Sequence, residues 1–333
     1  MTDLAHTVDE AAQEAAFTGV VHVGEDGREL LTATYGQADR AFGVRMDRAT
    51  RLAIASGSKS FTAVVVAALV EAGVLGFDTR ARDLLGEDLP DIDDAVTVRQ
   101  LMNHRSGIGD YFGESEVEIL DYAMTVPVHA LATTEDYLPV LAGHPTVFRP
   151  GTSFEYCNGG FVVLALLAER AAATPFHDLV TRYVTEPAGM SATGYDRSDE
   201  LDGGAARHYL FDEGLRTNVL HLPVRGSGDG GAYSTVDDIQ RFWSALLDDQ
   251  LLSPQMCAEL WAPVSDVPRM SAHYGMGFWL RPAKHVVFME GYDAGVSFRS
   301  MLQRERNLRV TVMANCTDGA WPVVSRLESV LDL

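Results

Sequence analysis

Hydrophobic positions along this chain follow a strand-like pattern near both ends and a helix-like pattern in the middle. Short runs rich in β-branched and aromatic residues, separated by turn residues, cover residues 17–24, 29–35, 274–280, 285–289, 296–303 and 308–314. Asp26 and Gly27 lie between the first two runs, and this pair is typical of a tight hairpin. The pattern predicts an α+β fold, in which helices flank one antiparallel sheet built from both chain ends.

The part of the chain between about residues 77 and 225 differs in character, because Asp, Gly and Pro residues punctuate segments typical of helices and loops. We therefore predict a discontinuous sheet domain made of residues 1–76 and 226–333. The intervening residues 77–225 are predicted to form an inserted, mostly helical lobe.

The charge of the chain argues against two classes of partner. The 333 residues include 47 acidic and 26 basic side chains, which gives a formal net charge of −21. Nucleic acids and anionic membranes attract basic proteins, so we expect neither as a partner. Hydrophobic residues make up 47% of the chain, which is ample for a packed core.

Cysteine and histidine spacing indicates neither a disulfide framework nor a metal site. We expect structural roles for His104 and the other histidines, and no cofactor. The N-terminal stretch lacks the basic start and apolar core of an export signal. The longest apolar runs, residues 61–70 and 161–168, are shorter than the roughly 18–20 residues of a membrane-spanning helix. We therefore expect a cytoplasmic protein, and the sequence leaves its oligomeric state open.

Ser56 and Lys59 lie three residues apart at the predicted start of the apolar helix over residues 61–70. Residues at this spacing share one helix face, with Cβ atoms about 5–6 Å apart, so the Lys59 amine can reach the Ser56 hydroxyl. Serine needs such a base to become a nucleophile, and lysine acts as one only where its pKa is lowered. The alternative is an N-capping serine beside a solvated lysine, because S-x-x-K alone is weak evidence.

A second polar motif, YCN at residues 156–158, follows a Pro-Gly turn and precedes another apolar helix. Together with SGSK at residues 56–59, it resembles the serine β-lactamase and penicillin-binding-protein superfamily. The closer likeness is to class C β-lactamases, D-alanyl-D-alanine carboxypeptidases and family VIII esterases. Further stretches that resemble this branch, in the same order, are LMNHRSGI, FRPGTSFEYCNGGF, TEPAGMSATGY and GDGGAYSTVDDIQRF. The resemblance covers nearly the whole chain and implies a β-lactamase-like fold.

The resemblance also implies roles for the residues of both motifs. Ser56 would be acylated, Lys59 would take or relay its proton, and Tyr156 would act as a phenolate or relay toward the leaving group. A tyrosine with a pKa near 10 becomes a usable base only where a cation such as Lys59 stabilises its phenolate. Asn158 would bond to the substrate's acyl carbonyl or to Lys59. The alternatives are a buried structural tyrosine and an asparagine that only caps a helix.

The third element of the resemblance is a K-T-G or H-x-G motif on a strand, and here the chain departs from the pattern. Alignment of MEGYDAGVSFRSML places Met289 where the family has lysine or histidine, whereas Gly291 is retained. The resemblance implies that the N–H groups of Tyr292 and Ser56 form the oxyanion hole, because a glycine lets substrate lie close to the strand. Met289 would remove a group that helps to hold a substrate carboxylate.

These observations predict an S-x-x-K serine hydrolase that forms an acyl-enzyme on a small ester or amide. Because of Met289, we expect poor hydrolysis of penicillins and cephalosporins. One alternative is an acyltransferase that passes the acyl group to an amine or alcohol instead of water. Another is a non-catalytic binding protein on the same scaffold, which the change at Met289 motivates. The three retained polar side chains of the two motifs favour the enzyme.

Overall fold

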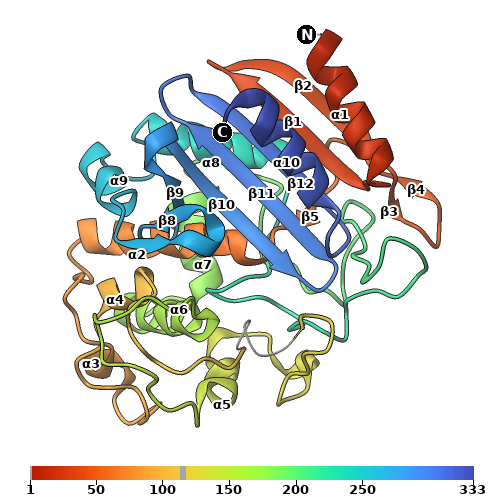
Figure 1. Ribbon diagram of the computed structural model, residues 1–333. Helices are drawn as coiled ribbons and strands as arrows, with labels where there is room; N and C mark the ends of the chain where they lie inside the picture. The colour runs from red at the N-terminus through yellow and green to blue at the C-terminus, as the bar shows by residue number, and fades with distance from the viewer. Residues whose placement is uncertain (1, 113–117) are drawn as a thin grey trace.

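The computed structural model describes residues 2–112 and 118–333, and one large antiparallel sheet dominates it (Figure 1). The strand order is β2-β1-β12-β11-β10-β9-β8-β7. The strands are β1 Gly19–Glu25, β2 Arg28–Tyr35, β7 Ser265–Val267, β8 Ala272–Tyr274, β9 Trp279–Arg281, β10 Val286–Asp293, β11 Val296–Gln303 and β12 Leu308–Ala314. Figure 1 shows the red N-terminal strands beside the blue C-terminal ones. The predicted sheet from both chain ends is confirmed.

The first hairpin of the sheet forms where the sequence predicts it. Asp26 and Gly27 connect β1 to β2, and both have positive φ angles, of 50° and 74°. Such a turn matches the twist of the two strands that it joins. On its other edge β1 pairs with β12, so that Gly19 lies opposite Ala314. This pairing joins the two ends of the chain.

Helices cover both faces of the sheet. On one face, α1 Thr2–Glu14 and α10 Ala320–Leu331 pack against β1 and β12, where Val21 and Val312 contribute to a buried cluster. On the other face, Val20 and Met313 belong to a second cluster with α2 Lys59–Glu71 and α8 Val236–Leu247. This alternation follows from the two-residue period of a strand, which turns successive side chains to opposite faces.

Shorter elements fill the rest of the described residues. The other helices are α3 Ala81–Leu85, α4 Val98–Met102, α5 Leu138–Leu141, α6 Asn158–Ala172, α7 Phe176–Val180 and α9 Pro254–Leu260. Short 3-10 turns are η1 Ala55–Ser58, η2 Val128–Ala130, η3 Thr134–Tyr137, η5 Pro268–Met270 and η6 Pro282–Lys284, and η4 Thr181–Thr185 is a π-helical turn. Small ladders join β3 Gln37–Asp39 to β4 Val44–Arg45 and β5 Leu52–Ala53 to β6 Tyr233–Ser234.

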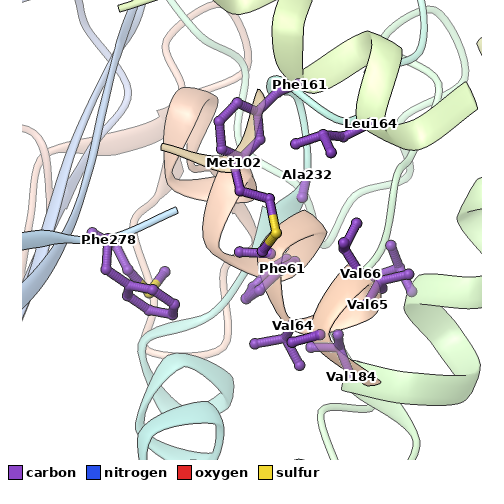
Figure 2. Close-up of a cluster of buried hydrophobic side chains, with 14 of the residues drawn as sticks. Phe61, Val64, Val65, Val66, Met102, Phe161, Leu164, Val184, Ala232 and Phe278 are labelled. Atoms are coloured by element: carbon purple, nitrogen blue, oxygen red, sulfur yellow. The ribbon is translucent and has the colours of Figure 1, made fainter. Parts of the chain in front are cut away.

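Helices α2 and α6 form the centre of the larger core (Figure 2). Every residue of α2 from Lys59 to Leu69 is buried, and so is every residue of α6 from Asn158 to Ala168. A helix that is apolar all round is stable only where neighbours cover all its faces. Figure 2 shows Phe61 of α2 and Phe161 of α6 in this cluster. Both motif-bearing segments therefore begin at buried helix ends.

Within the described ranges, no single helix is long and apolar enough to cross a membrane. Helix α6 and residues 176–185 pass the same length and composition test only as a pair bent by 84°.

The β-rich run predicted over residues 274–280 is interrupted in the structure. Strand β8 ends at Tyr274 and β9 begins at Trp279. Gly277 in the turn between them has a φ of 76°, and a Cβ atom there would lie 2.3 Å from the Ala63 Cβ of α2. Its carbonyl oxygen accepts a hydrogen bond from the Ser60 Oγ at 2.7 Å. Close packing against α2 therefore decides the local structure here, which strand propensity alone does not reveal.

This packing gives a stability test with a matched control. Gly277→Ala should destabilise the protein through the left-handed backbone, at about 1–2 kcal/mol, and through the clash with α2, at about 1–3 kcal/mol more. Gly73→Ala introduces the same methyl group at a φ of 71° with no atom within 4 Å, so it should lose only the backbone part. Urea denaturation measures both, and equal losses in the two variants would contradict the proposed contact.

Candidate active site

Lys59 lies at the centre of a cluster of polar groups beside Ser56. Its Nζ atom donates to the Ser56 Oγ at 2.8 Å, to the Asn158 Oδ1 at 2.7 Å and to the backbone oxygen of Asp229 at 2.7 Å. Lys59 is only 2% exposed, so these oxygens replace water around its amine. An ammonium has three N–H donors, and each has an acceptor here. The structure thus brings together Ser56, Lys59 and Asn158.

The turn that carries Ser56 is held at both ends. Ser56 lies in η1, and Lys59 is the first residue of α2, so the two helical segments are continuous. Ala55 has a φ of 45°, a left-handed conformation that costs a non-glycine residue about 1–3 kcal/mol. The Ser58 hydroxyl donates to the Ala55 carbonyl at 2.8 Å and accepts from the Ala232 N–H at 3.1 Å. These bonds fix the turn that presents Ser56.

Strand β10 borders this turn along its free edge. It pairs with β9 only over residues 286–288, so residues 289–293 lie next to η1 instead of a strand. A Cβ atom at Gly291 would lie 1.9 Å from the Ile54 carbonyl oxygen, so only glycine allows this approach. Tyr292 follows and lines the same cavity as Ser56. This arrangement is compatible with the predicted oxyanion hole of the Ser56 and Tyr292 N–H groups.

Tyr156 joins the site from the other side. Its ring centroid lies 4.9 Å from the Lys59 Nζ, and its ring stacks on Trp279 at 5.9 Å with an interplanar angle of 13°. The His104 ring lies 4.3 Å away, in contact with the same ring. An aromatic face attracts a cation, and aromatic neighbours restrict the ring, so the tyrosine is held in place next to the lysine.

His104 also holds the backbone on both sides of Tyr156. Its Nδ1 accepts from the Cys157 N–H at 3.1 Å, and its carbonyl oxygen accepts from the Glu155 N–H at 3.0 Å. Burial lowers the pKa of His104 well below its usual value, and the nearby Lys59 lowers it further. The imidazole is therefore neutral, as its role as an acceptor requires.

Asn158 begins α6, and Asp110 fixes that helix end. The Asp110 carboxylate accepts from the Asn158 N–H at 2.7 Å and from the Gly159 N–H at 2.8 Å. A carboxylate is favourable here, since the first N–H groups of a helix have no partner within it. Burial raises the pKa of Asp110 to about 6, although these backbone bonds oppose the rise. The carboxylate thereby orients the residue that binds Lys59.

A cavity of about 340 Å³ opens beside Ser56. Its lining residues are Ser56, Tyr156, Arg269, Met270, Trp279, Glu290, Tyr292 and Trp321. Met289 does not belong to them, because it is 1% exposed and packs in the hydrophobic core with residues such as Phe298. Strand alternation instead turns Glu290 toward the cavity, where it forms an ion pair with Arg299. The substrate contact predicted for Met289 is thus corrected: its side chain belongs to the core.

The family model described as Beta-lactamase matches residues 4–333 of this chain. The chain belongs to the β-lactamase family. The crystal structure of a penicillin-binding protein from Bacillus halodurans is 34% identical to it, with a TM-score of 0.90, and the match covers 97% of this chain and 99% of that one. The predicted β-lactamase-like fold is confirmed.

Two curated relatives extend beyond the matched region. Penicillin-binding protein 4* from Bacillus subtilis (strain 168) is 29% identical over 281 residues, which are 80% of this chain and 60% of that protein. A D-aminopeptidase from Cereibacter sphaeroides (strain KD131) is 36% identical over 231 residues, which are 61% of this chain and 41% of that protein. This β-lactamase-family chain therefore spans less than two thirds of the length of either relative.

Sequence reasoning missed two carboxylates near Lys59 in this β-lactamase-family site, those of Asp110 and Asp229, and the Tyr111 hydroxyl that bonds to Asp229. Asp110 and Tyr111 end the stretch LMNHRSGIGDY, and Asp229 lies in GDGG. The Asp229 carboxylate accepts a hydrogen bond from the Tyr111 hydroxyl, and burial raises its pKa although nearby Lys59 opposes the rise. The available signals were that Asp229 lies inside a stretch that resembles the family and that Asp110 follows another such stretch by two residues. Among the described residues, no group of three His, Cys, Asp or Glu side chains could hold a metal ion.

The raised pKa of Asp110 gives a pH test of stability. Its pKa of about 6 in the folded protein exceeds the usual value near 4, so folding favours its protonated form. This stabilising contribution is complete below pH about 4 and is lost as the pH rises through about 6. Relative to Asp110→Asn, the wild-type protein should thus be more stable at pH 4 than at pH 7. Denaturant unfolding at both values measures it, and a difference that is flat or rises with pH would contradict the assignment.

Proposed function

We propose that this protein is an S-x-x-K serine hydrolase that forms an acyl-enzyme at Ser56 on a small ester or amide. The observation that carries the proposal is the 2.8 Å hydrogen bond between the Lys59 Nζ and the Ser56 Oγ. A nucleophile within hydrogen-bond reach of a base, with that base oriented by further groups, is the usual arrangement for covalent catalysis. Asn158 and the Asp229 carbonyl supply the orienting groups.

In the proposed reaction the Ser56 Oγ attacks the substrate carbonyl carbon, and an O–C bond forms. The serine proton passes to Lys59 in its neutral amine form, or to Tyr156 in its phenolate form beside the Lys59 ammonium, and from there to the leaving group, so that the C–N or C–O bond breaks and an amine or alcohol departs. Backbone N–H groups of Ser56 and Tyr292 would stabilise the negative oxygen of the tetrahedral intermediate. Water then hydrolyses the acyl-enzyme and restores the Ser56 hydroxyl.

Similarity to a D-aminopeptidase supports an amide substrate over an ester, because the name of that relative indicates an amide substrate. Transfer to an amine or alcohol stays an alternative, which product analysis with added nucleophiles distinguishes from hydrolysis. The third possibility, a binding protein without activity, was motivated by Met289. That motive disappears because Met289 lies in the core, away from the cavity beside Ser56.

The first prediction concerns the nucleophile. A fluorophosphonate should label the wild-type protein on the peptide that contains Ser56, and Ser56→Ala should abolish both labelling and turnover. The variant should remain folded, because one hydroxyl at a helix start stabilises by about 1 kcal/mol at most. Intact-mass spectrometry and peptide mapping measure the adduct. Labelling that persists in the variant, or moves to another serine in the wild type, would exclude Ser56.

The second prediction concerns proton transfer. Lys59→Arg should be nearly as inactive as Lys59→Ala, because arginine keeps the positive charge but does not release its proton at neutral pH. Steady-state kinetics on an activated ester measures the loss, and thermal unfolding checks that both variants are folded. If Lys59→Arg retained more than about a tenth of the activity, corresponding to roughly 1.4 kcal/mol of barrier, only the charge would matter there.

A further inference from the structure

Asp229 carries a buried carboxylate that has no part in the proposed reaction. Its backbone oxygen accepts the hydrogen bond from the Lys59 Nζ at 2.7 Å. Every amino acid supplies such an oxygen, so this bond does not require an aspartate at position 229. Asp229 is only 9% exposed, and burial of a carboxylate is unfavourable unless partners replace the lost water. The acidic side chain therefore serves something other than the backbone hydrogen bond.

The carboxylate of Asp229 lies among one lysine and several tyrosines. Burial raises the pKa of Asp229, whereas nearby Lys59 and the Tyr111 hydroxyl oppose the rise and favour the ionised form. The Asp229 charge also acts on four tyrosines, but burial raises the pKa of each, so their hydroxyls are neutral at physiological pH. They are Tyr111, Tyr122, Tyr137 and Tyr195. Lys59 is therefore the positive group on which this carboxylate acts.

The other polar neighbours of Lys59 add no positive charge. Burial lowers the pKa of His104 well below its usual value and raises that of the Cys157 thiol well above it, so both side chains are neutral. The Tyr156 ring centroid lies 4.9 Å from the Lys59 Nζ. The charge of the amine is thus controlled by its burial and by the carboxylates around it.

Three further carboxylates lie in this region and are held by other partners. Asp110 also acts on Lys59, but its oxygens accept from the first N–H groups of α6. Asp196 and Asp293 line one cavity with Asp229. Arg51 pairs with Asp196 at 3.2 Å, and the Asp293 carboxylate accepts from the Ala294 N–H at 3.0 Å. These groups stay in place when only residue 229 is changed, so a variant there isolates its contribution.

Burial and a nearby carboxylate act on a lysine in opposite directions. Burial favours the neutral amine, which is the form that can take the Ser56 proton. The carboxylate stabilises the ammonium that forms when the proton arrives, or the ammonium that stands beside a Tyr156 phenolate. Both routes of proton transfer therefore pass through a state that the negative charge of Asp229 stabilises. No proton and no covalent bond passes to Asp229 itself.

We propose that Asp229 is a positioning residue that stabilises the ammonium form of Lys59 during acylation of Ser56 and thereby sets the lower pH limit of the reaction. This inference rests on the proposed function, because it assigns the group that supports the base of that reaction. A purely structural carboxylate, present only to accept the Tyr111 hydroxyl, would leave the protonation of Lys59 unaffected.

The protonation of Lys59 can be measured directly, because the chain contains only two lysines, Lys59 and Lys284. Lysine labelled with ¹³C at Cε should give two NMR signals, and Lys59→Arg assigns them. Asp229→Asn should lower the midpoint of the Lys59 titration by about one pH unit or more. Asp229→Ala, which also lacks an acceptor for Tyr111, should do the same, because both variants remove the charge. Lys284 pairs with Asp332 at an exposed site, and its signal is an internal control that should not move.

The pH profile of turnover should follow this titration. Because the base loses its proton more easily, Asp229→Asn should shift the acid limb of kcat/KM on an activated ester to lower pH by about one unit. The plateau value should fall several-fold, because a weaker base takes the serine proton less readily. Asp94→Asn also removes one negative charge, at an 80% exposed side chain, and should change neither the limb nor the Lys59 midpoint. Thermal unfolding checks that the variants are folded.

The outcomes separate this inference from the proposed function. A Lys59 midpoint that stays in place or rises in the folded Asp229 variants would overturn the inference, and so would an acid limb that does not follow a shifted midpoint. Either result would leave the hydrolase intact where fluorophosphonate labels Ser56. Absence of Ser56 labelling together with a lowered midpoint would instead contradict the hydrolase, while the effect of Asp229 on Lys59 would stand.

Discussion

The arrangement of the site depends on one requirement, which is that the buried amine of Lys59 must have hydrogen-bond acceptors. Lys59 is almost completely enclosed, and a buried ammonium without partners is strongly unfavourable. The three oxygens that accept its hydrogen bonds come from the turn before α2, from the start of α6 and from the segment around Asp229. Those segments are far apart in the sequence. The hydrogen-bond requirement of a single side chain therefore links the turn that carries Ser56 to the start of α6 and to the segment around Asp229.

Close backbone contacts and hydrogen bonds fix the positions of the segments that carry the site residues. Gly291 lets β10 approach the Ile54 carbonyl, and Gly277 lets the β8–β9 turn contact α2. His104 bonds to the backbone on both sides of Tyr156, and Asp110 fixes the first turn of α6. Each contact acts on a segment that carries a residue of the site. Catalytic groups supported in this way keep their geometry without reorganisation during the reaction.

Local patterns predicted much of the fold and the centre of the site. The Asp26-Gly27 hairpin and the buried helix after Ser56 depend on neighbours in the sequence, so they can be read from it. The same is true of the contact between Ser56 and Lys59, which needs only helical spacing. Tyr156 and Asn158 were found through the resemblance to a family, because nothing local indicates that they reach Lys59.

Long-range packing decided what the sequence did not reveal. The strand predicted around Met289 is present as β10, but the sequence did not show that the Met289 side chain faces the core and that Glu290 faces the cavity. Asp110 and Asp229 carry no spacing signal, since their importance arises from contacts with α6 and with Lys59. The role of His104 was likewise hidden, because its partner residues lie about fifty positions away in the chain.

The central claim is that Ser56, activated by Lys59, carries the acyl group during turnover. Rapid mixing with a p-nitrophenyl ester, followed by acid quenching and intact-mass spectrometry, tests it most directly. The account predicts a transient mass increase equal to the acyl group, located on the Ser56 peptide and lost again as water hydrolyses it. Turnover without any such adduct, or with the adduct on another residue, would contradict it.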